Sequence, residues 1–375
     1  CSYCLSSIDK CLRFREIELV KKELQFFIDK KVPQVKFVDR TFNCRHDHAM
    51  AIWTYIHEHD NGITNFHFEV SADLLNEKEI ALINRMRPGL IQLEIGVQSA
   101  NEITIREINR TMKIDVLSTI VDKIKKGNNV HQHLDLIAGL PYEGYESFGK
   151  SFDRVYKMNP EQLQLGFLKV LKGSVMHDRA QEYGIVYQDR APYEVLSTKW
   201  LTYAEVIRLK QIEEMVEVYY NSGQFCCTMA ALEQEFASPF CMYECLAAYY
   251  DEKNAFAVSH SRIGRYEILY DFIVKTCKER SEQYMEMLTL DMYLRDNVKK
   301  RPEFLRESGV SSDEAAAFYK KEEKERTYLK AYEGYDRRQM RKMTHLERID
   351  GKTVLFDYKN RDPLTGNAAI YYLSE

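Results

Sequence analysis

Apolar and polar positions along the first 180 residues follow two alternating patterns. Residues 16–31 carry apolar side chains at helical spacing, and a Val-Pro pair at 32–33 leads into a short β-rich run at 35–39. Further β-rich runs, each bounded by polar, Gly or Pro residues, follow at 65–70, 90–97, 130–138 and 162–170. Helices fit between these runs, so the pattern predicts an α/β fold whose parallel strands close into a full or partial barrel.

The pattern changes beyond Gly173-Ser174. Residues 190–348 are helix-like, with long amphipathic segments at 203–220 and 263–278 and a charge-dense stretch at 320–326. Between residues 352 and 372, apolar and polar positions alternate on both sides of Asp362-Pro363-Leu364-Thr365-Gly366. This last pattern is typical of a β-hairpin.

Composition narrows the class of protein. The chain has 375 residues, a formal net charge of -4 and nine cysteines. The slight acidity argues against a polyanion-binding protein, and no apolar run is long enough to span a bilayer. Scattered cysteines in odd number do not form the paired framework of a secreted scaffold. We therefore expect a cytoplasmic protein whose thiols stay available for metals.

The first four residues, Cys1-Ser2-Tyr3-Cys4, look like half of a metal site. Two thiolates at this spacing can share one metal or cluster, but a stable site needs three or four ligands. The chain also begins without an initiator Met or a helix cap. We therefore expect that the start of a longer protein is missing and that a further ligand lies upstream of Cys1.

Polar residues also stand inside otherwise apolar strands. Glu69, Gln98 and Asp135 fall on successive β-rich runs, near the carboxyl ends where a parallel barrel carries its functional residues. A buried carboxylate is costly unless it is paired or hydrogen-bonded. Glu69 and Asp135 could each be ordinary polar residues of a barrel interior, but their occurrence on successive strands favours a ligand site.

Together these features resemble the radical S-adenosylmethionine superfamily. Cys1-Ser2-Tyr3-Cys4 is similar to the last two cysteines of the family's Cys-x-x-x-Cys-x-x-Cys cluster motif. The family's coproporphyrinogen-oxidase and Elongator-like members have motifs in the same order as three segments of this chain, Gly96-Val97-Gln98-Ser99, Asn109-Arg110 and 135–141. The resemblance implies a partial (β/α)6 TIM-like barrel at residues 1–180, without its first strand and first cluster cysteine. Residues 181–375 then form a mainly helical domain with a terminal β-hairpin.

The resemblance also implies two cofactors. A [4Fe-4S] cluster held by Cys1, Cys4 and an upstream cysteine leaves one iron open for the amino and carboxylate groups of S-adenosylmethionine. The contacts it implies for S-adenosylmethionine are Tyr3, Ile137 and Val170 at the adenine, Glu69 and Gln98 on neighbouring strands, Arg110 at the methionyl carboxylate and Asp135 at the ribose hydroxyls.

Some of these residues have alternative interpretations. Tyr3 could simply fill the core, and Arg110 could be a surface arginine after a strand. Where the family often has a Gly-rich strand end, this chain has Val38-Asp39-Arg40-Thr41. Asp39 could bind the amino group of the cofactor or cap the following helix.

The C-terminal half resembles an uncharacterised domain found behind many cobalamin-binding radical enzymes. It implies methyl transfer, with cobalamin held by a missing N-terminal domain, or a cyclase-type reaction like that of the anaerobic porphyrin-ester cyclases. Either would act on a small-molecule substrate with an external electron donor such as flavodoxin or ferredoxin. The alternatives are an RNA-modifying radical enzyme, which the lack of a basic patch disfavours, and a barrel-derived binding protein without catalysis.

Other cysteines and histidines have simpler interpretations. Cys226-Cys227 with Cys241 and Cys245 could bind a second cluster, but Cys241 and Cys245 lie one turn apart on a predicted helix, where buried Cys acts as a small hydrophobe. His57 and His59, two apart on a predicted helix, face different ways. His131 and His133 share one strand face and could approach a substrate or hydrogen-bond inside the barrel.

Overall fold

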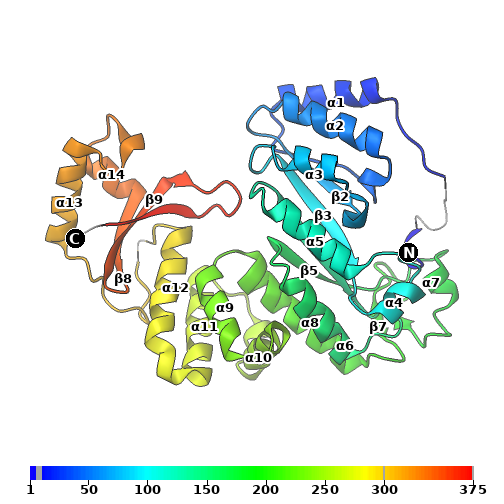
Figure 1. Cartoon of the computed structure of the whole chain (residues 1–375). Coiled ribbons are helices and arrows are strands. Elements are labelled where there is room, and N and C mark those ends of the chain that lie inside the picture. Colours follow the sequence, from blue (N-terminus) through cyan, green and yellow to red (C-terminus); the bar gives the residue numbers. More distant parts are fainter. Residues whose placement is uncertain (6–10, 299, 374–375) are drawn as a thin grey trace. The chain divides into compact units, whose positions relative to one another are not determined.

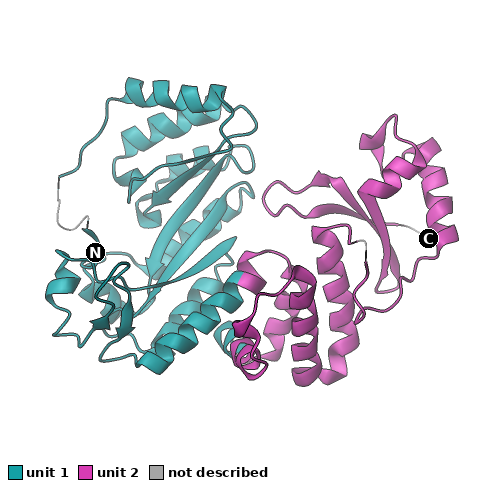
Figure 2. Cartoon of the chain, turned by 180° about the vertical axis from the view of Figure 1, so that it is seen from behind, with its two compact units in different colours: residues 1–217, 238–244 teal, residues 218–237, 245–375 magenta. Residues whose placement is uncertain are grey.

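The computed structural model of the chain describes residues 1–5, 11–298 and 300–373. It divides into two compact units (Figure 2): residues 1–217 with 238–244, and residues 218–237 with 245–375. Helix α10 (Pro239–Glu252) therefore begins in the first unit and ends in the second. The sequence predicts a domain boundary after residue 180, and this division stays a prediction. The first compact unit extends to residue 217.

The first unit is built on five parallel strands in the order β1-β2-β3-β4-β5 (Figure 1). The strands are β1 (Gln34–Lys36), β2 (Asn65–Val70), β3 (Ile91–Gln98), β4 (His131–Ala138) and β5 (Gln162–Phe167). A short antiparallel pair follows, β6 (Val186–Tyr187) with β7 (Val195–Ser197). The predicted α/β fold with a partial barrel is confirmed.

Helices connect consecutive strands of this sheet, as parallel pairing requires. Apolar side chains at helical spacing build them, and α1 starts where the carboxylate of Glu16 accepts hydrogen bonds from the backbone N–H groups of Glu18 and Leu19. The connecting helices are α2 (His46–Glu58), α3 (Glu77–Ile83), α4 (Glu102–Glu107), α5 (Ile114–Lys125) and α6 (Tyr145–Tyr156). Helix α1 (Ile17–Asp29) precedes β1, and α7 (Val175–Asp178) and α8 (Tyr203–Val216) follow β5.

The first turn of α10 completes the packing around α6. The Phe240 ring lies 5.6 Å from the Phe152 ring and 5.5 Å from the Tyr145 ring, centroid to centroid. The backbone N–H of Phe240 donates to Asp153 Oδ1 at 2.7 Å, and Phe240 is only 7% exposed. Residues 238–244 thus belong to the core of the first unit although 20 residues of the second unit precede them in the chain.

A buried carboxylate ties the ends of β3 and β4 to α6. Glu143, which follows β4, is 1% exposed, and its Oε1 accepts hydrogen bonds from the hydroxyls of Ser99 and Ser151, both at 2.7 Å. Glu143 Oε2 has no hydrogen-bond partner within the described residues. Burial raises the pKa of Glu143 to about 7, although the two serine hydroxyls oppose this by stabilising the ionised form.

The second unit combines helices with a three-stranded antiparallel sheet in the order β10-β9-β8. Its strands are β8 (Thr344–Ile349), β9 (Lys352–Arg361) and β10 (Ala368–Tyr372), and its helices, besides the end of α10, are α9 (Cys226–Leu232), α11 (Arg262–Thr276), α12 (Ser281–Arg295), α13 (Ser312–Glu325) and α14 (Arg337–Met343). The predicted terminal hairpin is confirmed as β9 and β10. The helical prediction for 190–348 is wrong at β8 and at β7.

Strand β8 carries a charge on its buried side. The side chain of Glu347 is 1% exposed and pairs with Arg301, Nη1 to Oε2, at 2.5 Å. Burial would raise the pKa of Glu347, but contacts with His345 and Arg301 outweigh burial and hold the pKa at about 2. Within the described residues, no helix is long and apolar enough to cross a membrane.

Candidate functional site

Alternate residues of the parallel strands point to one face of the sheet, and on that face they are polar. Strand pairing sets Glu69 beside Glu94, Gly96 beside Asp135 and Asp135 beside Gln164. Because side chains alternate with a period of two, these residues share a face near the carboxyl ends of the strands. They line a cavity of about 580 Å³ in the first unit.

The N-terminal residues lie at the same cavity. The backbone N–H of Ser2 donates to Ile108 O at 2.8 Å, and Met176 N–H donates to Ser2 O at 3.0 Å. These bonds hold the segment between the loop after α4 and the start of α7, and Cys1, Tyr3 and Cys4 line the cavity. The structure therefore brings the candidate metal ligands to the candidate strand residues.

Two guanidinium groups lie against the two thiols. Arg40 Nη1 is 3.0 Å from Cys4 Sγ, and Arg110 Nη1 is 3.5 Å from Cys1 Sγ. A neighbouring positive charge favours the thiolate, which is the form that binds metal. Arg110 also donates from Nη2 to the carbonyl of Gly96, and its side chain is partly buried at the cavity.

Gln98 has an unusual backbone. Its φ is 75°, in the left-handed region that residues other than Gly seldom adopt, and the β3–β4 register shifts between Gly96 and Gln98. Bulges of this kind re-aim a side chain next to a functional site. Gly96 leaves room for this side chain, since a Cβ at that position would lie 2.1 Å from Gln98 Nε2.

The side chain of Asp135 is largely buried and lies near two other carboxylates, Glu69 and Glu94. Burial and the charges of Glu94 and Glu69 raise the pKa of Asp135 to about 8, while Lys36 and Arg110 oppose the rise. His133 Nε2 lies 3.2 Å from Asp135 Oδ1, yet neither atom has a hydrogen-bond partner in the part of the chain that the structure describes.

Two basic side chains contact Glu94 in this group. Contact with His67, 2.9 Å from Nε2 to Oε2, and with Lys36 lowers the pKa of Glu94 to about 2 despite burial. Lys36 Nζ lies 3.2 Å from Glu94 and 4.0 Å from Glu69. Burial, followed by the charge of Glu94, raises the pKa of Glu69.

Three buried polar atoms at the cavity have no protein partner among the described residues. They are Gln98 Oε1, Arg110 Nε and Asp135 Oδ1. Buried polar groups are nearly always hydrogen-bonded, so their partners are expected in a ligand. Their chemistry, a guanidinium donor, an amide oxygen and a carboxylate, fits a zwitterionic nucleoside such as S-adenosylmethionine.

Two residues proposed from the sequence as cofactor contacts, Val170 and Asp39, do not line the cavity. Val170 is fully buried and the neighbouring Leu171 lines the cavity instead, whereas Ile137 lines it as expected. Asp39 is exposed and outside the lining, where Arg40 and Thr41 stand. Tyr3 lines the cavity, and burial raises the pKa of its hydroxyl to about 12.

Sequence reasoning missed the far side of the cavity. Lys210 and Glu213 reach it from α8, and Glu194 from the loop before β7. Lys210 Nζ lies 2.5 Å from Glu194 Oε1 and 4.2 Å from the centre of the Phe167 ring. The only signal in the sequence is the i, i+3 spacing of Lys210 and Glu213 on a predicted helix, which is common on solvated faces.

Two family models match parts of this chain. Residues 1–155 match the family model "Radical SAM superfamily", and residues 181–363 match "Protein of unknown function (DUF4080)". An oxygen-independent coproporphyrinogen III oxidase of Salmonella typhimurium is 29% identical over 107 residues, which are 27% of this chain and 23% of that protein. The match thus spans about a quarter of the curated relative.

Solved structures give weaker likenesses. Coproporphyrinogen III oxidase (HemN) from Escherichia coli, described as a radical SAM enzyme, is 16% identical with a TM-score of 0.39 and covers 56% of this chain and 48% of that one. The cobalamin-dependent S-adenosylmethionine radical enzyme OxsB is 12% identical with a TM-score of 0.43 and covers 75% of this chain and 50% of that one.

Proposed function

We propose that this chain, which belongs to the radical SAM superfamily through residues 1–155, cleaves S-adenosylmethionine reductively and uses the product on a small-molecule substrate. The proposal rests on one observation: buried polar atoms of Gln98, Arg110 and Asp135, which have no hydrogen-bond partner among the described residues, line one cavity with Cys1 and Cys4.

Cys1 and Cys4 would supply two of the three thiolates that hold the [4Fe-4S] cluster. When bound and reduced, the cluster supplies the electron that breaks a carbon–sulfur bond of the sulfonium, giving methionine and a 5′-deoxyadenosyl radical. The guanidinium groups of Arg40 and Arg110 lie beside the two sulfurs, where a positive charge would favour the thiolate form that binds iron.

The strand residues would bind and orient S-adenosylmethionine. Arg110, fixed by the Gly96 carbonyl, has a free Nε for the methionyl carboxylate, and Gln98 presents an amide oxygen to the methionyl amino group. Asp135 would accept the ribose hydroxyl hydrogens. Since those hydroxyls favour the ionised acceptor, ligand binding should bring the pKa of Asp135 down from about 8.

The substrate would meet the charged far side of the cavity. Lys210, Glu194 and Glu213 give this side both signs of charge, which suits a polar small molecule better than an apolar one. We also propose that methyl transfer with cobalamin, or cyclisation, is the outcome, and that flavodoxin or ferredoxin supplies the electron. The support for this finer statement is the resemblance of the C-terminal half to domains found behind cobalamin-binding radical enzymes.

Anaerobic reconstitution of the protein as expressed from its gene tests the proposal. We expect four irons and four sulfides per chain, and 5′-deoxyadenosine after addition of S-adenosylmethionine and dithionite. Both should be lost in Cys1→Ala, Cys4→Ala and kept in the matched control Cys11→Ala, Cys44→Ala. A full [4Fe-4S] complement in Cys1→Ala, Cys4→Ala would move the cluster elsewhere, and an intact cluster without 5′-deoxyadenosine would favour a binding protein.

A further inference from the structure

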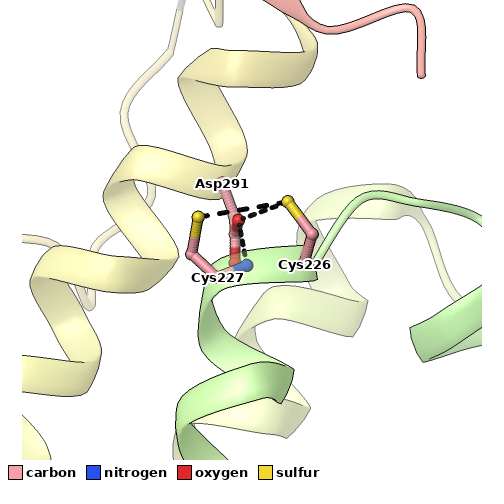
Figure 3. Close-up of side chains that lie close together, drawn as sticks. All are labelled: Cys226, Cys227 and Asp291. Carbon is pink, nitrogen blue, oxygen red and sulfur yellow. Dashed lines mark hydrogen bonds between the residues drawn. The ribbon is translucent and has the colours of Figure 1, made fainter. Parts of the chain in front are cut away.

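Two adjacent cysteines in the second unit face a buried carboxylate (Figure 3). Cys226 and Cys227 open α9, and Asp291 projects toward them from α12. Cys226 Sγ lies 3.3 Å from Asp291 Oδ1 and 4.0 Å from Cys227 Sγ. One ligand atom of each residue lies within 4.8 Å of the other two.

We propose that Cys226, Cys227 and Asp291 bind a thiophilic divalent cation of the zinc class, at a site separate from the iron–sulfur cluster. Zinc bonds of about 2.3 Å to sulfur and about 2.1 Å to oxygen, arranged tetrahedrally, set sulfurs about 3.8 Å apart and sulfur about 3.6 Å from oxygen. The observed 4.0 Å and 3.3 Å are each within about 0.3 Å of those edges. The third pair, Cys227 Sγ and a carboxylate oxygen of Asp291, lies within 4.8 Å, so binding would need these side chains to move closer together.

The charge of Asp291 points the same way. The residue is 1% exposed, and the groups that hydrogen-bond to its carboxylate, from Cys226, Cys227 and Thr228, are all uncharged donors. A buried carboxylate without a positive partner is costly, and a divalent cation between it and the thiols would supply the missing charge.

Asp291 is already oriented for such a role. Its Oδ1 accepts the backbone N–H of Cys227 at 2.9 Å, and its Oδ2 accepts the backbone N–H of Thr228 at 2.8 Å. Hydrogen bonds of this kind fix a ligating carboxylate and are part of a well-formed metal site. These bonds alone would explain Asp291 as a partner of the α9 backbone, but they do not explain why both thiols also lie within 4.8 Å of its carboxylate.

The arrangement predicts an open site with three protein ligands. Cys226 is exposed and Cys227 is partly exposed, so an ion can enter from solvent and keep water or another small ligand in the fourth position. Cys241 and Cys245, the other half of the second cluster considered from the sequence, are not part of this group. Binding forms two metal–sulfur bonds, releases two thiol protons and changes no oxidation state.

Cobalt(II) titration of the full-length chain in a Cys1→Ala, Cys4→Ala background tests the proposal, because the background removes the iron–sulfur ligands. The reduced protein is titrated anaerobically and followed by the thiolate-to-cobalt charge-transfer band and the visible bands of a tetrahedral ion. We expect one equivalent bound, displacement by zinc, and release of about two protons per ion.

Cys226→Ser and Cys227→Ser should each weaken zinc binding at least about a hundredfold, and Asp291→Asn about ten- to a hundredfold. The matched control Cys241→Ser, Cys245→Ser should bind as the background does. Circular dichroism checks the fold, and if Asp291→Asn unfolds, the two single cysteine variants decide. A background protein without the charge-transfer band, or a band that survives in both cysteine variants, would overturn the proposal.

Discussion

Replacing Glu143 by glutamine should remove a pH-dependent loss of stability from the first unit. In the folded chain the pKa of Glu143 is about 7, against an ordinary value of 4.5. Between these values the folded state holds a proton that the unfolded state has lost, so the free energy of unfolding falls as the pH rises. At about 1.4 kcal/mol per pH unit, the fall amounts to about 3 kcal/mol by pH 8.

Glutamine keeps an oxygen that can accept the hydrogen bonds of Ser99 and Ser151, but it cannot ionise. Its amide nitrogen replaces Oε2, which has no hydrogen-bond partner in the described chain. Any cost of the unpaired amide is the same at every pH. The test therefore compares how stability varies with pH in the two proteins, and not their absolute stabilities.

Tryptophan fluorescence isolates the relevant unit, since the two tryptophans of the chain, Trp53 and Trp200, both lie in the first unit. Urea unfolding is measured between pH 4.5 and pH 8 for the parent, Glu143→Gln and the exposed control Glu146→Gln. We expect the stability of Glu143→Gln to gain on the parent by about 3 kcal/mol across this range, and that of Glu146→Gln to follow the parent. A constant difference between Glu143→Gln and parent would refute the reasoning.

Arg110→Ala should weaken S-adenosylmethionine binding to the reconstituted protein by roughly 2–5 kcal/mol, and Arg110→Lys should restore part of it; equal calorimetric affinities would remove Arg110 from the site. Gly96→Ala puts a Cβ 2.1 Å from Gln98 Nε2, so the Gln98 side chain must move. The affinity for S-adenosylmethionine should then fall about tenfold, which corresponds to the loss of one charge-assisted hydrogen bond, while the unfolding midpoint stays unchanged. A parallel drop in that midpoint would instead mean a folding defect. Arg301→Ala strands the carboxylate of Glu347 and should cost the second unit about 3 kcal/mol in urea unfolding followed by circular dichroism. Because the pKa of Glu347 is held at about 2, below its ordinary 4.5, this cost should shrink as the pH falls through that interval, and a cost independent of pH would contradict it.

Local pattern was enough to predict the parallel sheet. The runs at 65–70 and 130–138 match β2 and β4 to within one residue, because apolar strands between Gly, Pro and polar breaks leave little choice of boundary. Strand β8 was missed because a charge, Glu347, occupies its buried side. Its partner Arg301 lies 46 residues away, and no local pattern reveals such a pair.

The cavity was predicted on its strand side only. Glu69, Gln98 and Asp135 stand out as polar residues in apolar runs, and the structure places all three at one cavity. Lys210 comes from a helix beyond the barrel, where a charged residue has no periodicity to mark it. Asp291 was missed for a similar reason, since it lies 64 residues from Cys227 and meets it only through the packing of α9 on α12.

The return of residues 238–244 to the first unit has a consequence for synthesis. On the ribosome, the unit cannot complete its core when residue 217 emerges, because the Phe240 ring that packs on Phe152 is still missing. The 27 further residues take roughly one to five seconds to add at about 5–20 residues per second. During that interval the apolar face of α6 is exposed and can form non-native contacts. A nascent chain stalled shortly after residue 217 should thus be more sensitive to protease and more dependent on chaperones than one stalled after Glu244 has left the exit tunnel.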